Sequence, residues 1–296
     1  MQDTAAPGSS SPSDSARKVT LADGRSLAFA EYGDPDGTPV IAFHGLPGSR
    51  LFGRFYADAA MDAGVRIVAP ARPGYGESSP KRDRTVSDWA ADVRELADHL
   101  GFDEFSVVGY SAGGPHALAV AASCDRVTRV AVVAGMAPRA VVSGGPWFLK
   151  LMVPLGRHAP WILGALFRMQ AWLAERQDDA EMLSFLTDRP IGDVPVDGQR
   201  TVEAVLAADF QNAFEHGPSG AVGDSRAVNR PWGVAFDDID VPVRGWYGTA
   251  DDNVPVEAAG WLSDVVPEAT VERVPDEDHL SVLVETRETV CSWLAD

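Results

Sequence analysis

Four short apolar runs in the first half of the chain have the length and composition of buried strands. They are residues 38–43, 66–69, 104–108 and 127–133, and none shows the sustained polar alternation of a strand with one solvated face. Between them lie segments with apolar residues at helical spacing, of which residues 85–100 are the clearest. Strands that alternate with helices predict an α/β fold with a mostly parallel sheet, covered by helices on both faces.

The two ends of the chain extend this pattern. Residues 18–32 read as strand, turn and strand, with Asp23-Gly24 as the turn pair. Residues 241–294 contain two further strand and helix pairs. Residues 1–16, rich in Ser, Pro, Ala and Asp, cannot bury enough apolar surface to fold and predict a flexible tail.

The alternation stops between residues 138 and 231. This part contains no convincing buried strand, and its apolar segments, separated by Pro and Gly, predict a helical insertion between two strands of the sheet. The α/β core is then residues 17–137 and 232–296. We expect most large side chains of the insertion to bury it against this core, and some to line a hydrophobic pocket. They are Trp147, Phe148, Trp161, Phe167, Trp172, Phe185, Phe210 and Phe214.

One predicted strand and one predicted helix are joined by Gly109-Tyr110-Ser111-Ala112-Gly113. A Gly-x-Ser-x-Gly sequence in this context is a nucleophile elbow, a tight turn that lifts the serine hydroxyl clear of the sheet. Gly109 and Gly113 are required because a Cβ atom at either position would crowd the neighbouring strand and helix. The first free N–H groups of the helix point at whatever Ser111 attacks, and the N–H of Ala112 is one oxyanion donor.

A serine hydroxyl needs a general base, and the base needs a group that orients it. Of the six histidines, only His279 follows the last predicted strand, at the sheet edge where active sites of parallel sheets lie. The acid, in the order Ser, acid, His, falls after the preceding strand and is Asp251 or Asp252. These residues predict a charge-stabilised Ser-His-Asp arrangement.

Four ordered motifs make the chain similar to α/β-hydrolases of the serine esterase and proline iminopeptidase-like branch, which carry a helical cap. They are His44-Gly45-Leu46-Pro47-Gly48, Arg72-Pro73-Gly74-Tyr75-Gly76-Glu77-Ser78, the elbow, and Gly248-x-x-Asp251-x-x-Val254-Pro255 with His279. The similarity covers everything but the tail. Ala71 departs from it, because relatives commonly carry Asp before Arg-Pro-Gly.

The resemblance implies an eight-stranded sheet with residues 138–231 as the cap. It also implies that the acid is Asp251, three residues after Gly248, with Asp252 as the alternative. The catalytic residues are then Ser111, Asp251 and His279. The backbone N–H of Leu46 is the second oxyanion donor beside that of Ala112, and we expect His44 to brace its loop instead of acting as a base.

The composition of the chain excludes some classes of binding partner and cofactor. A formal net charge of −18 argues against nucleic-acid binding and against docking on anionic membranes. Cys124 and Cys291 are expected to be buried thiols, and no ligand-spaced cluster suggests a metal or organic cofactor. Residues 1–16 lack the features of a secretory signal, so we expect a cytoplasmic enzyme with a small hydrophobic substrate.

Three functions fit these residues. The first is hydrolysis of carboxylic esters with small or medium hydrophobic acyl groups, through an acyl-enzyme. The second is a proline iminopeptidase-like aminopeptidase, in which Glu175, Glu181, Glu203 or Glu215 would hold the free amino group. The third is a ligand-binding homologue with low turnover. C–C bond hydrolysis and perhydrolysis are also open to the same catalytic group.

Overall fold

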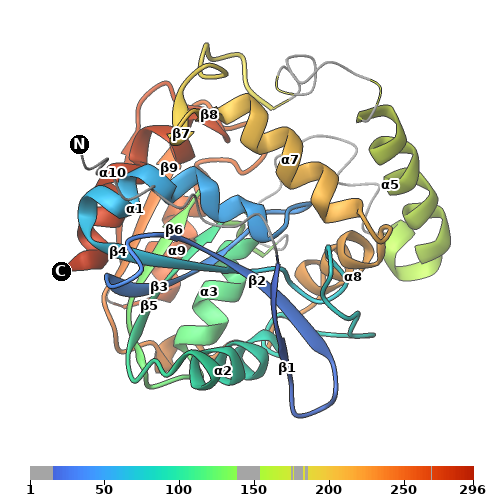
Figure 1. Cartoon of the computed structure of the whole chain (residues 1–296), viewed down its shortest axis with the longest axis horizontal. Coiled ribbons are helices and arrows are strands. Elements are labelled where there is room, and N and C mark those ends of the chain that lie inside the picture. Colours follow the sequence, from blue (N-terminus) through green and yellow to red (C-terminus); the bar gives the residue numbers. More distant parts are fainter. Residues whose placement is uncertain (1–15, 139–153, 175, 177–182, 184–185, 268) are drawn as a thin grey trace, which may run out of the picture.

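A single sheet of eight strands forms the centre of the protein, in the order β1-β2-β4-β3-β5-β6-β9-β10 (Figure 1). The computed structural model describes residues 16–138, 154–174, 176, 183, 186–267 and 269–296. Strand β2 runs antiparallel to β1 and β4, and the strands from β4 to β10 pair in parallel. The predicted fold class is confirmed. The strands are β1 (Arg17–Thr20), β2 (Ser26–Gly33), β3 (Thr38–Phe43), β4 (Val65–Pro70), β5 (Phe105–Tyr110), β6 (Val127–Val133), β9 (Val243–Gly248) and β10 (Ala269–Val274).

Both faces of the sheet are covered. The 3₁₀ helix η1 (Arg50–Tyr56) and helices α1 (Ala57–Ala63) and α10 (Ser281–Ala295) pack on one face. Helices α2 (Trp89–Leu100), α3 (Gly113–Ala121) and α9 (Glu257–Val265) pack on the other. Because side chains alternate along a strand, the neighbours Val107 and Val108 of β5 are both fully buried but belong to opposite layers. This double burial explains the continuous apolar runs of the sequence.

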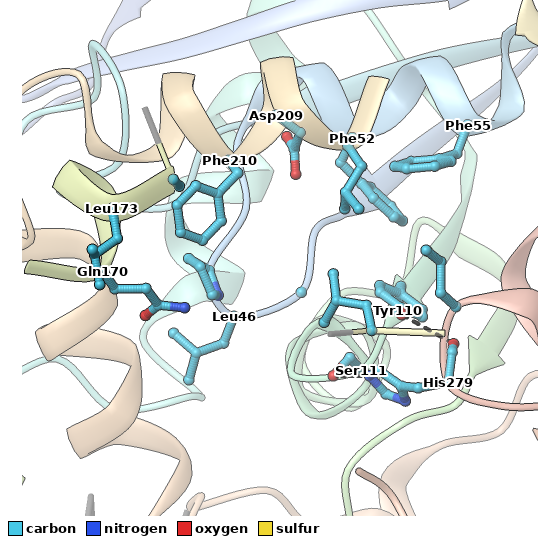
Figure 2. A pocket seen from close by; sticks show the side chains of 16 residues that line it. Leu46, Phe52, Phe55, Tyr110, Ser111, Gln170, Leu173, Asp209, Phe210 and His279 are labelled. Carbon is cyan, nitrogen blue, oxygen red and sulfur yellow. Dashed lines mark hydrogen bonds between the residues drawn. The ribbon is translucent and has the colours of Figure 1, made fainter. Parts of the chain in front are cut away.

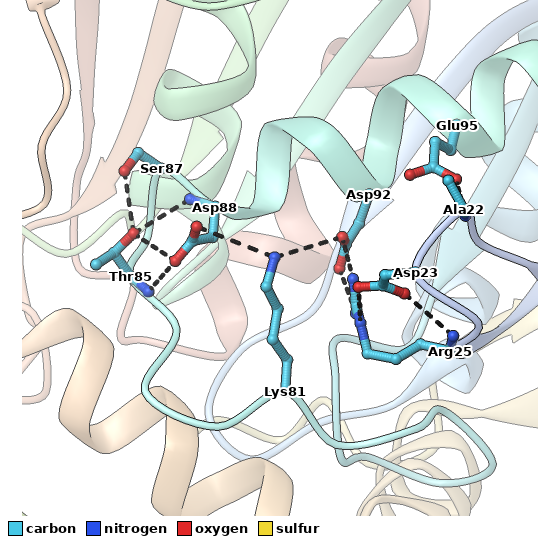
Figure 3. A network of polar contacts seen from close by, with 9 residues as sticks. All are labelled: Ala22, Asp23, Arg25, Lys81, Thr85, Ser87, Asp88, Asp92 and Glu95. Atoms are coloured by element: carbon cyan, nitrogen blue, oxygen red, sulfur yellow. Dashed lines mark hydrogen bonds and ion pairs between the residues drawn. The ribbon is translucent and has the colours of Figure 1, made fainter.

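Helix α2 begins four residues later than the start of its predicted segment because the first residues form a capping turn. The N–H of Thr85 donates to Asp88 Oδ2 at 2.7 Å, and the N–H of Asp88 donates back to Thr85 Oγ1 at 3.3 Å. Further along α2, Asp92 accepts two hydrogen bonds from Arg25, at 2.8 and 2.6 Å, and lies 3.8 Å from Lys81 (Figure 3). These contacts fasten the β1–β2 turn and the loop before α2 to the helix.

The segment between β6 and β9 contains helices α5 (Pro160–Ala174), α7 (Val202–Phe214) and α8 (Ser219–Val228). It also contains a small hairpin, β7 (Pro195–Asp197) and β8 (Arg200–Thr201), which the sequence did not predict because strands this short show no periodicity. The 3₁₀ turn η2 (Phe236–Asp238) leads back to the sheet. The division into a core of residues 17–137 and 232–296 and a cap of residues 138–231 stays a prediction.

The large apolar residues of this segment differ in burial. Phe167 is buried, whereas Trp161 and Trp172 of α5 are 74% and 52% exposed, so they do not pack against the core as the majority was expected to. Trp147, Phe148, Phe185 and residues 1–15 lie outside the described residues. Within the part of the chain that the structure describes, no helix combines the length and the apolar character needed to cross a membrane.

Candidate active site

Ser111 sits on a sharp turn between β5 and α3, with a φ of +53° that is unusual for a residue with a side chain. The turn is held by its backbone, since the N–H of Ser111 donates to Val133 O at 3.0 Å. A Cβ on Gly109 would lie 2.4 Å from the carbonyl oxygen of Gly113, and a Cβ on Gly113 would lie 2.2 Å from that of Phe43. The predicted need for glycine at both positions is therefore confirmed.

The structure brings Ser111, His279 and Asp251 together from three separate loops. Ser111 Oγ lies 3.0 Å from His279 Nε2, and His279 Nδ1 lies 2.7 Å from Asp251 Oδ2. The second carboxylate oxygen of Asp251 accepts the N–H groups of Asn253 and Val254, both at 2.8 Å, which fixes its orientation. His279 and Asp251 are only 8% and 6% exposed, so water competes little for these hydrogen bonds.

Asp252, the alternative acid, is exposed, whereas Asp251 is the acid that contacts His279. The hydroxyl of Tyr110 donates to the carbonyl oxygen of His279 at 3.0 Å and ties the histidine loop to the elbow. His116 is also buried and hydrogen-bonded to Ala112 O at 2.8 Å. Burial lowers the pKa of His116 to about 3, so this second histidine near the elbow stays neutral.

The loop with Leu46 lies against the elbow. A Cβ added to Gly45 would be 3.5 Å from Ser111 Cβ, and Leu46 itself lines the cavity above the serine. Ala112 follows Ser111 at the start of α3, where helix N–H groups are free. The two residues predicted to supply oxyanion donors are therefore neighbours of Ser111, and their role as donors stays a prediction.

His44 supports this loop through both ring nitrogens. Its Nε2 accepts the N–H of Arg72 at 3.1 Å, so Nδ1 carries the proton and donates to Gly45 O at 2.9 Å. Burial, reinforced by the charge of Arg72, holds the pKa of His44 well below its usual value. A neutral histidine with both nitrogens engaged agrees with the expected bracing role.

Arg72 extends this support to α8. Its guanidinium donates to the carbonyl oxygens of His44, at 2.5 Å, and Gly45, at 2.7 Å. Asp224 of α8 accepts from Arg72 at 2.8 Å and from Arg84 at 2.6 Å, and its side chain is fully buried. The two arginines hold the pKa of Asp224 below its usual value despite burial. At the position where relatives commonly carry Asp, this chain has Ala71. The carboxylate that pairs with Arg72 is Asp224 of α8.

A cavity of about 360 Å³ opens onto Ser111 and His279. This volume lies in the range of small-molecule sites. Figure 2 shows Ser111 and His279 on one side of the cavity and Asp209 of α7 on the other, with Phe52 and Phe210 beside Asp209. The apolar wall is formed by Leu46, Pro47, Phe52, Phe55, Leu173, Ala174, Leu186, Leu206, Phe210 and Leu280.

Asp209 is a wall residue that the sequence analysis missed. Its Oδ1 accepts the N–H of Ser49 at 2.8 Å and the Ser49 hydroxyl at 2.7 Å, and the residue is 6% exposed. Burial raises the pKa of Asp209 to about 7, although the Ser49 hydrogen bonds oppose the shift. Asp209 shares the buried face of α7 with Val202 and Val205, so a carboxylate at an apolar helical position was the available signal.

The two described acids named for an aminopeptidase do not form the cavity wall. Glu203 and Glu215 are absent from the lining residues, and Glu175 and Glu181 lie outside the described part of the chain. Among the described residues, no three His, Cys, Asp or Glu side chains gather in a way that could hold a metal ion.

Comparisons with known proteins show relatives with several activities. Over 120 residues the chain is 36% identical to a proline iminopeptidase of Xanthomonas citri, a match that spans 38% of this chain and 37% of that protein. An esterase from Thermogutta terrifontis has a similar structure, with a TM-score of 0.69 and 21% identity over 95% of this chain and 98% of its own. The enol-lactonase from Burkholderia xenovorans gives a TM-score of 0.70 and 21% identity, covering 95% of this chain and 100% of its own.

At these identities the solved structures establish the shared fold, and the chain spans less than half the length of the curated relatives it matches. The family assignment rests instead on a match that covers most of the chain. A family model described as the alpha/beta hydrolase fold matches residues 38–286, which include the elbow, the Leu46 loop, Asp251 and His279. The chain belongs to the alpha/beta hydrolase fold family.

Proposed function

We propose that this protein is a serine hydrolase that cleaves carboxylic esters with small or medium hydrophobic acyl groups. The observation that carries the proposal is the continuous chain of hydrogen bonds from Ser111 through His279 to Asp251, at 3.0 and 2.7 Å, beside an apolar cavity. Such a chain activates a hydroxyl that is otherwise a weak nucleophile at neutral pH. The esterase and lactonase named among the structural neighbours support the proposal.

In the first half of the reaction, Ser111 Oγ attacks the ester carbonyl carbon and its proton passes to His279 Nε2. Asp251 accepts from His279 Nδ1, which sets the tautomer and stabilises the imidazolium. The N–H groups of Leu46 and Ala112 are proposed to hold the oxyanion, with help from the positive end of α3. The tetrahedral intermediate collapses when the alcohol departs with the proton from His279, leaving an acyl group on Ser111.

In the second half, a water molecule loses a proton to His279 Nε2 and its oxygen attacks the acyl carbon. The new tetrahedral intermediate collapses, Ser111 regains the proton from His279, and the carboxylic acid leaves. Each proton taken by the histidine is returned, so the enzyme ends unchanged and one ester plus one water gives one acid plus one alcohol.

The experiment that tests the proposal compares covalent labelling with turnover. Wild type should gain the mass of one fluorophosphonate adduct and hydrolyse p-nitrophenyl hexanoate, whereas Ser111→Ala should do neither. Ser123→Ala removes an exposed hydroxyl outside the cavity and should behave as wild type. A folded wild type that takes up no label and turns over no ester would refute the proposal and favour a ligand-binding protein.

A proline amide substrate should be run in the same assay. The relatives named as proline iminopeptidases make this comparison necessary, but Glu203 and Glu215 are not in the cavity wall. We therefore expect the hexanoate ester to be hydrolysed faster than proline p-nitroanilide. Faster release of proline would replace the esterase assignment with an aminopeptidase.

A further inference from the structure

One buried carboxyl group faces a mainly apolar cavity, and the ester chemistry makes no use of it. Among the described lining residues, Asp209 is the carboxyl, and Gln170 and Tyr110 are the other polar side chains besides the catalytic pair. Figure 2 places Asp209 across the cavity from Ser111 and His279. Burying a carboxyl beside Phe52 and Phe210 costs stability unless its polar atoms are satisfied. An apolar acyl group cannot satisfy it.

The carboxyl of Asp209 is held in place by backbone and side-chain donors of η1 and the residue before it. Oδ1 accepts both the N–H and the hydroxyl of Ser49, at 2.8 and 2.7 Å, so Ser49 fixes the direction of the side chain. The backbone N–H of Phe52 also donates to this carboxyl, and the cavity reaches the residue. A carboxylate has about four acceptor sites, so these three donors fix its orientation and still leave room for a ligand group in the cavity.

We propose that Asp209 determines specificity by hydrogen-bonding a neutral donor, such as a hydroxyl group, on the apolar acyl portion of the substrate. The inference rests on the proposed function, because it concerns the acyl group that Ser111 carries. The acyl portion is the relevant one, since it stays attached to Ser111 in the cavity after the alcohol has left.

A neutral donor fits this position better than a cation. Asp209 already feels the positive charges of Arg72 and Arg54, which lowers the attraction for another positive group. A cation would also lose its hydration in a cavity walled mainly by hydrocarbon, a larger penalty than that for a hydroxyl. Burial keeps much of the Asp209 carboxyl protonated near neutral pH, and a hydroxyl can pair with either protonation state.

The test uses three p-nitrophenyl esters of one chain length, namely hexanoate, 6-hydroxyhexanoate and 6-aminohexanoate, with butanoate and octanoate analogues to bracket the reach. The quantity compared is kcat/KM for the hydroxyl ester divided by kcat/KM for the alkyl ester. Wild type should favour the hydroxyl ester, and Asp209→Leu should reduce this ratio about 10- to 100-fold, the loss of one hydrogen bond to a buried carboxyl. Glu203→Gln, on the same helix but outside the cavity wall, should leave the ratio unchanged.

Asp209→Asn separates hydrogen bonding from charge. Asparagine keeps an oxygen for Ser49 and a polar group toward the cavity, so it should retain most of the hydroxyl preference. A wild type that prefers the amino ester increasingly above pH 7, with that preference lost in Asp209→Asn, would overturn the neutral donor in favour of a cation site.

Two further outcomes would overturn the inference about Asp209. A wild-type ratio of one or less at every chain length overturns the inference even if Asp209→Leu fails to fold. An unchanged ratio in a folded Asp209→Leu does the same. Fluorophosphonate labelling and hexanoate turnover are measured in the same samples. An ester hydrolase in which Asp209 binds no hydroxyl group still takes up the label at Ser111, so failure of this inference can be told apart from failure of the proposed function. Absence of labelling in folded wild type overturns both.

Discussion

Replacing Asp224 by alanine should destabilise the protein strongly, because it removes the shared partner of two buried arginines. Asp224 is fully buried, and it accepts hydrogen bonds from Arg72 at 2.8 Å and from Arg84 at 2.6 Å. Arg72 is 0% exposed and Arg84 is 6% exposed, so neither guanidinium can turn into solvent to replace the lost contact. The variant must bury two positive charges without their shared carboxylate.

The magnitude follows from the cost of an unpaired buried charge. Breaking a buried pair by removing one partner costs about 3–5 kcal/mol, far more than the net value of the intact pair. For a protein of this size, that is a fall in Tm of roughly 10 °C. Ester turnover should fall as well, because Arg72 also holds the carbonyl oxygens of His44 and Gly45 beside the proposed oxyanion donor.

Urea unfolding of wild type and Asp224→Ala measures the free energy of unfolding directly. The matched control is Asp98→Ala, which breaks the ion pair with Arg126 at 2.8 Å on a side chain that is 67% exposed, and should cost about 1 kcal/mol or less. If Asp224→Ala loses no more stability than Asp98→Ala, the reasoning that the Arg72–Asp224–Arg84 contacts are effectively desolvated is wrong. The pKa of Asp224 is lowered in the folded protein, so its contribution should persist at neutral pH and decline only in acid, as pH falls below about 4.

Three other changes test the site. Asp251→Asn should lower kcat by about 10⁴-fold, because the histidine loses its correct tautomer; Asp252→Asn, one residue away, should leave ester turnover unchanged. The raised pKa of Asp209 means that the folded protein holds this proton longer than the unfolded chain, so stability should fall between pH 4 and 8, by up to about 4 kcal/mol. In urea unfolding, Asp209→Asn should lack that part of the pH dependence, and identical profiles would contradict the buried titration. Gly113→Ala places a Cβ 2.2 Å from a backbone oxygen and should abolish turnover or folding. The control is Gly260→Ala, in helix α9, where a Cβ would meet nothing within 4 Å. This change should raise the free energy of unfolding by about 0.5–1 kcal/mol. Normal ester turnover in Gly113→Ala would show that the elbow tolerates a shift.

The sheet and the elbow could be predicted from sequence because their signals are local. A run such as residues 105–108 is buried by both helical layers, so its composition alone indicates a central strand. The same regularity points to Ser111, to His279 and to an acid at position 251 or 252, since each stands beyond the carboxyl end of a parallel strand, and the family resemblance favoured Asp251. Topology brings these loops together without any need to know the side-chain packing.

The insertion could not be predicted to the same depth. Its hairpin β7–β8 is too short to show a period, and the exposure of Trp161 depends on how α5 lies against its neighbours. The contacts of Asp209 and Asp224 join residues about 150 positions apart in the chain, which no local pattern encodes. Both are carboxylates at buried helical positions, a signal that marks a residue as unusual without naming its partner.

These two acids explain why the insertion and the catalytic loop should be treated as one unit. Asp209 of α7 accepts from Ser49, at one end of the loop that carries Leu46. Asp224 of α8 holds Arg72, which in turn holds the other end at His44 and Gly45. The proposed oxyanion donor therefore lies between two contacts supplied by insertion helices. A change in α7 or α8 that alters the cavity also alters the support of the donor, so substrate preference and the rate of the chemical step should vary together.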